Sequence, residues 1–163
     1  MRLPICGMLL SIVVAAATPA FGASTDWDQC KDVNNKATAE MSLAACNRIL
    51  KDPSEAKYHA MALRNRCGIR YTMDDLEGAL ADCNQAAHME PQSAIVYNRR
   101  GLTWYTKRDN NRTISDYNQA IQLNPNYTLA YYNRGLARQA KGDTAACDAD
   151  VAHAKKLQPD VGD

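Results

Sequence analysis

The sequence predicts an all-α protein made of repeated helical hairpins, and two observations support that prediction. Residues 94–127 align with residues 128–161 without a gap, at an offset of 34, and ten of the 34 pairs are identical. Gly101/Gly135 and Pro125/Pro159 are among them. Each copy also holds two apolar-periodic segments, which are typical of amphipathic helices that pack as a hairpin.

The N-terminus differs from the rest of the chain. A basic start, Met1-Arg2, precedes the apolar run LLSIVVAAA at residues 9–17 and a segment of small residues. This layout predicts a signal peptide over residues 1–22, with cleavage after Gly22, or after Ala20 or Ala23 as alternatives. The run is short for a membrane span, although a permanent N-terminal anchor is the alternative, and nothing later in the sequence resembles a span. We therefore expect a periplasmic or secreted protein without membrane insertion after cleavage, and the alanine-rich leader suggests a bacterium.

Charge narrows the class of partner. Loss of Arg2 with the leader leaves 18 basic residues against 18 acidic residues, so the mature chain has no net charge. Proteins that bind nucleic acid usually show a basic excess or a basic stripe. We therefore do not expect a nucleic-acid partner.

Earlier copies of the repeat precede residue 94. Residues 79–91 match 113–125 at an offset of 34, and residues 64–71 match 97–104 at an offset of 33. This alignment pairs Gly68 with Gly101 and predicts that the intervening turn is one residue shorter than in the next copy. Residues 42–53 resemble the second half again. The expected domain, residues 23–163, thus holds a partial repeat at 27–53 and repeats at 60–93, 94–127 and 128–161.

This pattern resembles the tetratricopeptide repeat family over residues 27–161. The residues that carry the resemblance are the glycines of the first helix, the alanines of the second helix and the prolines that end it: Gly68, Gly101 and Gly135; Ala79, Ala120 and Ala154; Pro91, Pro125 and Pro159. The resemblance implies a tetratricopeptide-like helical-hairpin solenoid of about three and a half repeats.

Cysteine spacing predicts two disulfides. Cys30 and Cys46 are separated by the same interval as Cys67 and Cys83, and in the repeat frame each pair joins the two helices of one hairpin. An exported chain favours oxidation, and each bond would contribute about 3 kcal/mol. Free buried thiols are the alternative. Cys147 is left over, as a buried inert thiol or as an intermolecular disulfide partner.

No catalytic constellation is visible in the sequence. His59, His88 and His153 occupy unrelated repeat positions, and no metal-ligand, nucleophile or phosphate-loop motif occurs. We expect no enzyme activity, no metal and no cofactor. As an alternative, the cysteine-paired hairpins resemble the Sel1-like repeat proteins, some of which are linked to binding or hydrolysing β-lactam-type cell-wall ligands. Their repeats run longer than the repeat of this chain and lack its proline register.

The tetratricopeptide resemblance implies a concave groove, lined by the first helix of each repeat, for an extended or helical peptide. The corresponding groove residues are Asn65, Arg66, Ile69, Asn98, Arg99, Leu102, Tyr105, Tyr132, Asn133 and Leu136. The asparagines would bond a peptide backbone, the arginines a carboxylate, and the tyrosines would be anchors. These polar residues would otherwise only solvate an exposed helix face. Arg100 and Arg134 are expected to be structural and to bond the neighbouring repeat.

These features together predict a non-catalytic adaptor or scaffold that binds protein or peptide in the bacterial cell envelope. The predicted helix at 144–157 has no helix after it to cover its outer side. That side is a candidate surface for self-association.

Overall fold

The computed structural model of the chain describes residues 23–31 and 38–162. The predicted signal peptide and its cleavage site lie outside these residues. All regular structure in the described part is helical, as the sequence predicts. The helices are α1 (Ala23–Cys30), α2 (Ala39–Lys51), the 3-10 helix η2 (Pro53–Tyr58), α3 (His59–Thr72), α4 (Leu76–Met89), α5 (Ala94–Thr106), α6 (Asn110–Leu123), α7 (Thr128–Ala140) and α8 (Thr144–Leu157).

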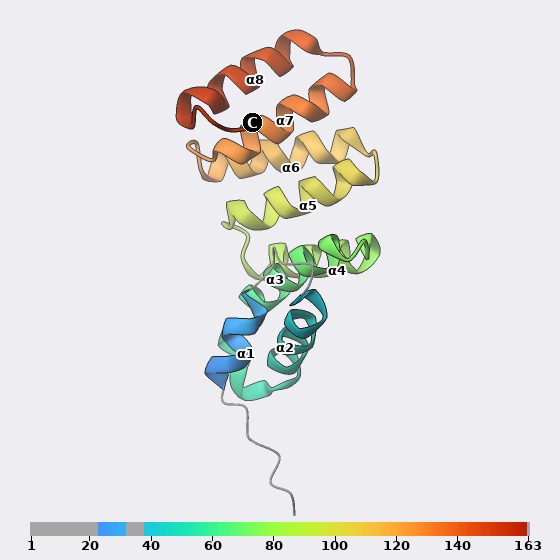
Figure 1. The fold of residues 1–163 in the computed structure, drawn as a ribbon, viewed down its shortest axis with the longest axis vertical. Coiled ribbons are helices and arrows are strands. Elements are labelled where there is room, and N and C mark those ends of the chain that lie inside the picture. The colour runs from blue at the N-terminus through green and yellow to red at the C-terminus, as the bar shows by residue number, and fades with distance from the viewer. Residues whose placement is uncertain (1–22, 32–37, 163) are drawn as a thin grey trace, which may run out of the picture.

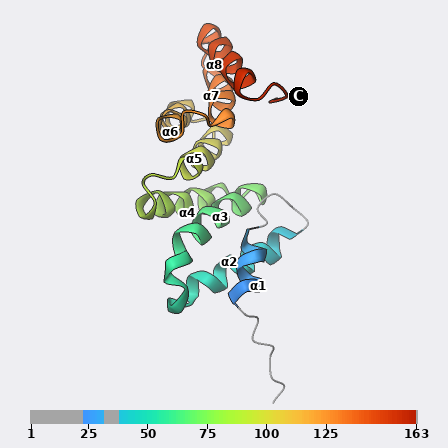
Figure 2. The ribbon, with the colours of Figure 1, turned by 90° about the vertical axis from the view of Figure 1, so that its left-hand side faces the viewer.

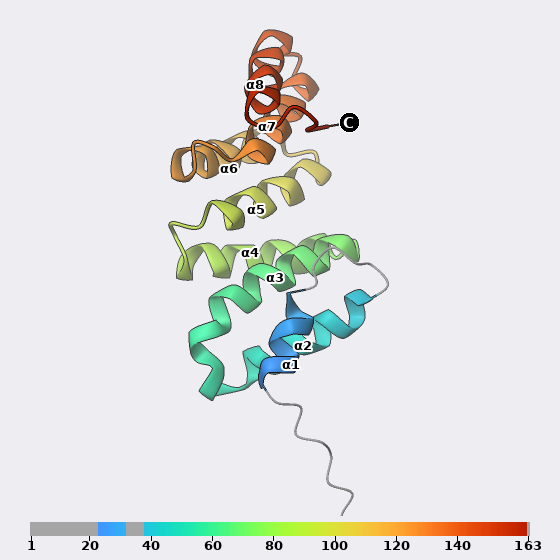
Figure 3. The ribbon, with the colours of Figure 1, turned by 60° about the vertical axis from the view of Figure 1, so that its left-hand side comes forward.

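The helices form a stack of four hairpins that runs from α1 and α2 at one end to α7 and α8 at the other (Figure 1). The two rotated views show the same order, with successive hairpins turned relative to one another (Figures 2 and 3). Helix α3 contacts α5, and α5 contacts α7. We call the side that they form the inner face.

Neighbouring hairpins are held together by small buried cores. Ala86 and Ala87 of α4 pack with Val96 of α5, and Ala120 of α6 packs with Ala130 of α7. One hairpin alone could not bury these side chains, so each repeat depends on its neighbour. No helix in the described ranges combines the length and apolarity that a membrane crossing requires.

The turn inside each of the last three hairpins has the same geometry. The backbone takes a positive φ at Asp74 (63°), Arg108 (62°) and Gly142 (83°), which are equivalent positions of successive repeats. The residue after each is an aspartate whose side chain accepts a hydrogen bond from the third backbone N–H beyond it and so caps the next helix. A left-handed residue followed by an N-cap is a short link between two antiparallel helices.

This geometry corrects the sequence alignment of residues 64–71. The turn of repeat 60–93 is as long as the others, so the offset to the next repeat is 34 throughout. Cys67, and not Gly68, is the counterpart of Gly101. The sequence alignment failed because it matched one glycine to another, whereas the closest approach of the two helices is occupied by a cysteine in this repeat.

The first hairpin has a different spacing. Cys30 and Cys46 correspond to Cys67 and Cys83 at an offset of 37. The offset is larger than 34 because the link between α2 and α3, which holds η2, is three residues longer than the link between α4 and α5. Both pairs are joined as disulfides, with Cα–Cα distances of 4.9 and 5.4 Å. Each bond links the two helices of one hairpin, as the cysteine spacing predicts.

Candidate functional site

A ladder of buried ion pairs runs through the three later hairpins. The guanidinium groups of Arg66, Arg100 and Arg134 each donate two hydrogen bonds, of 2.6–2.9 Å, to an aspartate of the second helix of the same hairpin, Asp82, Asp116 and Asp150. Each also donates to an asparagine of the preceding hairpin, Asn47, Asn84 and Asn118. The ladder therefore ties each hairpin internally and to its neighbour.

The ladder changes the role of one predicted groove residue. Arg66 was expected to bind a partner's carboxylate, but its planar fork is already held by Asp82, whose side chain is 3% exposed. Arg100 and Arg134 are structural, as the sequence predicts, although their carboxylates lie in their own hairpins. The hydrogen bonds to Asp116 raise the pKa of Arg100 above its usual value.

In the helices of the last three hairpins, acidic residues occur only on the outer helices. Helices α3, α5 and α7 contain seven arginines and no acidic residue. The ladder uses three of these arginines, and Arg70 and Arg138 bind Asp82 and Asp150 as well. The aspartates come from the outer helices α4, α6 and α8, so they neutralise these arginines from behind the inner face.

Arg99 is the arginine of the inner helices that has no carboxylate partner within the described part of the chain. One of its Nη atoms donates to the backbone oxygen of Arg64 at 2.5 Å and lies 3.5 Å from Oδ1 of Asn65. Burial, and next the charge of Arg64, lower the pKa of Arg99 to about 10. Gly68 leaves the space for this guanidinium, since a Cβ there would lie 3.0 Å from it.

The corrected register also rearranges the predicted groove positions. Asn65, Arg99 and Asn133 are equivalent, whereas Asn98 belongs to the adjacent column of residues. Ile69 was expected on the groove but is fully buried in the core that α3 forms with α1 and α2. Like Arg66, it was misplaced because the alignment of its segment was one residue out.

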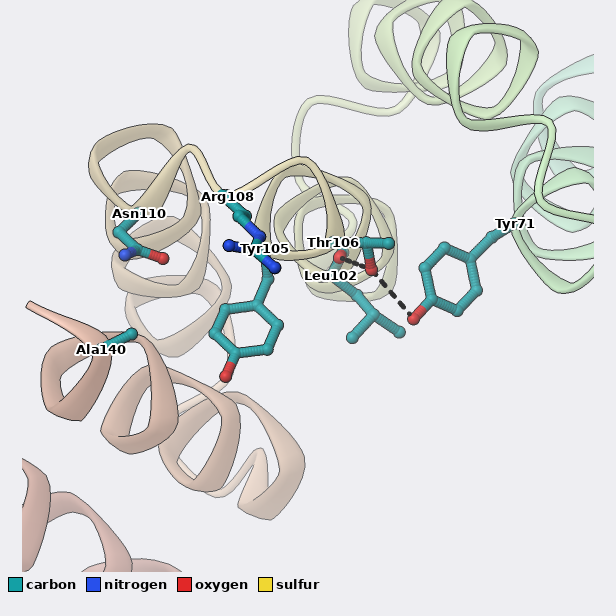
Figure 4. Close-up of a pocket in the computed structure, with 7 residues that line it drawn as sticks. All are labelled: Tyr71, Leu102, Tyr105, Thr106, Arg108, Asn110 and Ala140. Carbon is teal, nitrogen blue, oxygen red and sulfur yellow. Dashed lines mark hydrogen bonds between the residues drawn. The ribbon is translucent and has the colours of Figure 1, made fainter.

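A pocket of about 590 Å³ opens between the inner helices (Figure 4). Leu102 and Tyr105, both predicted groove residues, line it, and the prediction missed Tyr71, the equivalent of Tyr105 in the preceding repeat. The hydroxyls of Tyr71 and Thr106 are 3.2 Å apart. Arg108, Asn110 and Ala140 complete the lining. The correct register would have found Tyr71, because it gives Tyr105 a counterpart one repeat earlier.

The remaining predicted groove residues lie on α5 and α7. Asn98 is 7% exposed, and its Oδ1 has no hydrogen-bond partner among the described residues. Asn133 and Leu136 are partly exposed. Tyr132 is packed against Gly162, since a Cβ there would lie 2.5 Å from the ring. The turn after α8 thus covers Tyr132, and Val161 in that turn is buried.

The other reactive residues offer little chemistry. No group of three His, Cys, Asp or Glu side chains in the described ranges could hold a metal ion. Cys147 is buried and free. Desolvation, and then nearby aspartates led by Asp148, raise the pKa of its thiol, which disfavours the reactive thiolate.

A family model described as a TPR repeat matches residues 109–142, which span α6 and α7. No curated protein matches the chain. Solved structures share its fold. The first TPR domain of Spaghetti (RPAP3), bound to the HSP90 peptide SRMEEVD, aligns at 22% identity over 63% of this chain and 82% of that one, with a TM-score of 0.62. MamA from Desulfovibrio magneticus aligns at 14% identity over 86% of this chain and 78% of that one, with a TM-score of 0.71.

The match on one repeat, the equivalent hairpins at the same offset on both sides of it, and the shared architecture agree. The chain thus carries a match to the tetratricopeptide repeat at residues 109–142, and its described part has the stacked-hairpin fold of solved TPR structures.

Proposed function

We propose that this protein is a non-catalytic adaptor that binds a peptide segment of another protein along its inner face. The observation that carries the proposal is the acid-free surface of α3, α5 and α7, which holds a pocket and polar groups without partners among the described residues.

Unsatisfied groups on the inner face support a polar, chain-like ligand. The buried Oδ1 of Asn98 has no donor within the described part of the chain, and leaving such an acceptor unpaired costs about 1–3 kcal/mol. Arg99 keeps donor capacity toward an acceptor, because one of its nitrogens makes both of the side-chain hydrogen bonds described above.

A peptide is also the ligand of a structural neighbour. The first and second TPR domains of Spaghetti (RPAP3) are both seen with the HSP90 peptide SRMEEVD. Family members that bind the carboxylate of such a peptide use groove lysines, and α3, α5 and α7 contain no lysine, so we do not transfer that ligand. The shared feature that we propose is a peptide held by the first helices of the repeats.

Leucine substitutions on two faces test the proposal. Leu136→Glu places a carboxylate on the inner face, and Leu157→Glu makes the same change at a leucine of the outer helix α8 that is 37% exposed. Both purified oxidised variants and the parent would serve as baits for crosslinking capture from native cells. We expect Leu136→Glu to reduce the captured partner at least tenfold, because a desolvated carboxylate opposes an apolar contact.

The matched control decides the outcome. Leu157→Glu should capture as much partner as the parent, and circular dichroism should show that both variants are folded. Equal capture by the two variants would place the ligand on another face and refute the proposal.

We further propose that the protein works in the bacterial cell envelope after export. The layout of residues 1–22 supports this setting, as does the presence of two disulfides, which persist in oxidising compartments. N-terminal sequencing of the protein from fractionated native cells tests it. We expect a mature start at Ala23 in the periplasm or the medium, and a chain that keeps Met1 in the cytoplasm would contradict it.

The Sel1-like alternative receives no support from the spacing of the helices. The second helices of the last three hairpins begin at Leu76, Asn110 and Thr144, each at an offset of 34 from the one before. A β-lactam turnover assay on the oxidised chain would test the remaining possibility of hydrolysis, and we expect no turnover.

A further inference from the structure

The pocket of the inner face combines aromatic and aliphatic side chains with polar groups and one cation. Leu102 lies between Tyr71 and Tyr105, and the backbone turn that carries Arg108 borders the Tyr105 side (Figure 4). Its volume of about 590 Å³ is within the usual range for ligand pockets. Tyrosine rings offer faces and edges that favour another aromatic ring.

Arg108 has no carboxylate partner among the described residues, unlike the basic residues on either side. Lys107 pairs with Glu77, and Arg112 pairs with Asp109. None of the described residues that line the pocket is acidic. Within the described part of the chain, the guanidinium is therefore a free positive charge at the rim, and Arg108 lies three residues beyond Tyr105 in the turn that follows α5.

The conformation of Arg108 is the second observation. Its φ of 62° is a left-handed value, which costs an ordinary residue about 1–2 kcal/mol. The equivalent turns use Gly142, which has no such cost, and Asp74, a residue type that tolerates the conformation. An unfavourable residue at the turn that borders the pocket is consistent with selection for its side chain rather than for the turn.

We propose that this pocket binds an aromatic side chain of a peptide while Arg108 binds an acidic side chain within two positions of it. This inference rests on the proposed peptide binding and names the ligand chemistry. Charge complementarity argues for the acid, because α3, α5 and α7 bring no carboxylate to the inner face. The spacing follows from geometry: the backbone N–H of Arg108 donates to the carbonyl oxygen of Tyr105 at 2.9 Å, so the two residues are neighbours, and alternate residues of an extended peptide are about 6.6 Å apart.

A synthetic peptide array tests the proposal on the oxidised full chain. Each peptide places one aromatic residue, phenylalanine or tryptophan, and one acid, aspartate or glutamate, one to four positions apart in a glycine–serine background. Matched peptides replace the aromatic residue by alanine or the acid by lysine. We expect the strongest binding at separations of one or two, and about tenfold weaker binding for either replacement.

Variants of the protein test separately the preference for an acidic residue and the preference for an aromatic residue. Arg108→Gly adopts the residue of the next turn, so the fold should persist, and the preference for acid over lysine should disappear. Asp74→Gly is the same change in the preceding turn, outside the pocket lining, and should leave binding unchanged. Tyr105→Ala should abolish the aromatic preference.

The outcomes separate this inference from the proposed function. Acid selectivity that persists in Arg108→Gly, or an array without aromatic preference, would overturn the inference. If partner capture still depends on Leu136 in that case, peptide binding on the inner face stands with a different ligand chemistry. If the array shows the expected preference but Leu136→Glu has no effect on capture, the pocket stands and the wider inner-face assignment fails.

Discussion

Repeats 60–93 and 94–127 differ in the side chains that join the two helices of the hairpin. In the first, Cys67 and Cys83 occupy the place where α3 and α4 come closest, and a disulfide joins them. In the second, the same two positions hold Gly101 and Tyr117, and the tyrosine ring fills the space that a missing Cβ leaves.

The difference extends to the next helix. Val96 packs above the cysteine hairpin, where the following repeat has Ala130 against Tyr117. In one repeat a small cysteine, Cys83, is paired with the larger Val96, and in the next a large tyrosine, Tyr117, is paired with the smaller Ala130. The total side-chain volume is therefore roughly the same, as a close-packed interior requires. The comparison shows that the fold requires a fixed distance between the two helices of a hairpin and a fixed volume of side chains between them. A disulfide or a tyrosine packed on a glycine can meet both requirements.

The buried carboxylates should show the largest difference between the repeats. Asp82 binds both Arg66 and Arg70, whereas Asp116 binds only Arg100 among the described residues, because Trp104 stands where Arg70 does. We expect Asp82→Ala to cost about 3–5 kcal/mol in the free energy of unfolding, since two arginines lose their counter-charge. Asp116→Ala should cost less, and urea unfolding followed by circular dichroism measures both. Equal losses would show that Arg70 contributes nothing to the pair.

Removal of the disulfide in repeat 60–93 comes next. The double variant Cys67→Ala/Cys83→Ala should lower the stability of the oxidised protein by about 3 kcal/mol, the value expected for a loop of this size. The transplant Cys67→Gly/Cys83→Tyr/Val96→Ala should recover part of that loss, because it copies the packing of the following repeat. Its stability falling below that of the alanine variant would mean that the two solutions are not interchangeable.

Glycine substitutions probe the packed solution. A Cβ on Gly101 would lie 3.0 Å from the ring of Tyr117, whereas on Gly135 it would lie 3.2 Å from a methyl group of Val151. Gly101→Ala should cost about 1–2 kcal/mol, because the buried ring must move. Gly135→Ala should be close to neutral, because the helical preference of alanine offsets the contact. Thermal unfolding measures the two side by side, and the reverse order would contradict the packing argument.

The smallest expected effect concerns the turns of the same two repeats. Arg108→Gly should raise stability by about 0.5–1 kcal/mol, because glycine adopts the left-handed conformation without strain. Asp74→Gly should change stability less, because aspartate already tolerates that conformation. Urea titration of both variants checks this, and a loss of stability in Arg108→Gly would show that its side chain makes a structural contact.

The sequence predicted the fold class well, because periodic apolar residues and the prolines that end each second helix make the repeat visible in the sequence. It predicted the inner face less well. One glycine match moved residues 64–71 by one position, which put Ile69 in the predicted groove in place of Gly68 and left Tyr71 out. A one-residue shift on a helix turns each side chain by about 100°, so this error brought a core residue into the predicted groove and left a pocket residue out.

The last hairpin differs from the earlier hairpins on its stacking surface. The residues of α8 equivalent to Leu80 and Ala87 of α4 are Asp148 and Lys155, and both are exposed. The stacking surface of the last hairpin is thus charged where the inner hairpins are apolar. The predicted self-association stays a prediction, which sedimentation at rising concentration would test.

The sequence by itself determined the helical hairpins, their regular spacing and the pairing of the cysteines, because these depend on local periodicity and on spacing along the chain. Only the tertiary structure decided which arginines are committed to buried aspartates and which, like Arg99 and Arg108, have no carboxylate partner in the described part of the chain. An arginine looks alike in the sequence whether or not it is paired, and its partner lies on another helix. Whether a carboxylate faces it depends on the packing of that helix, and this packing separated the structural ladder from the surface proposed to bind a ligand.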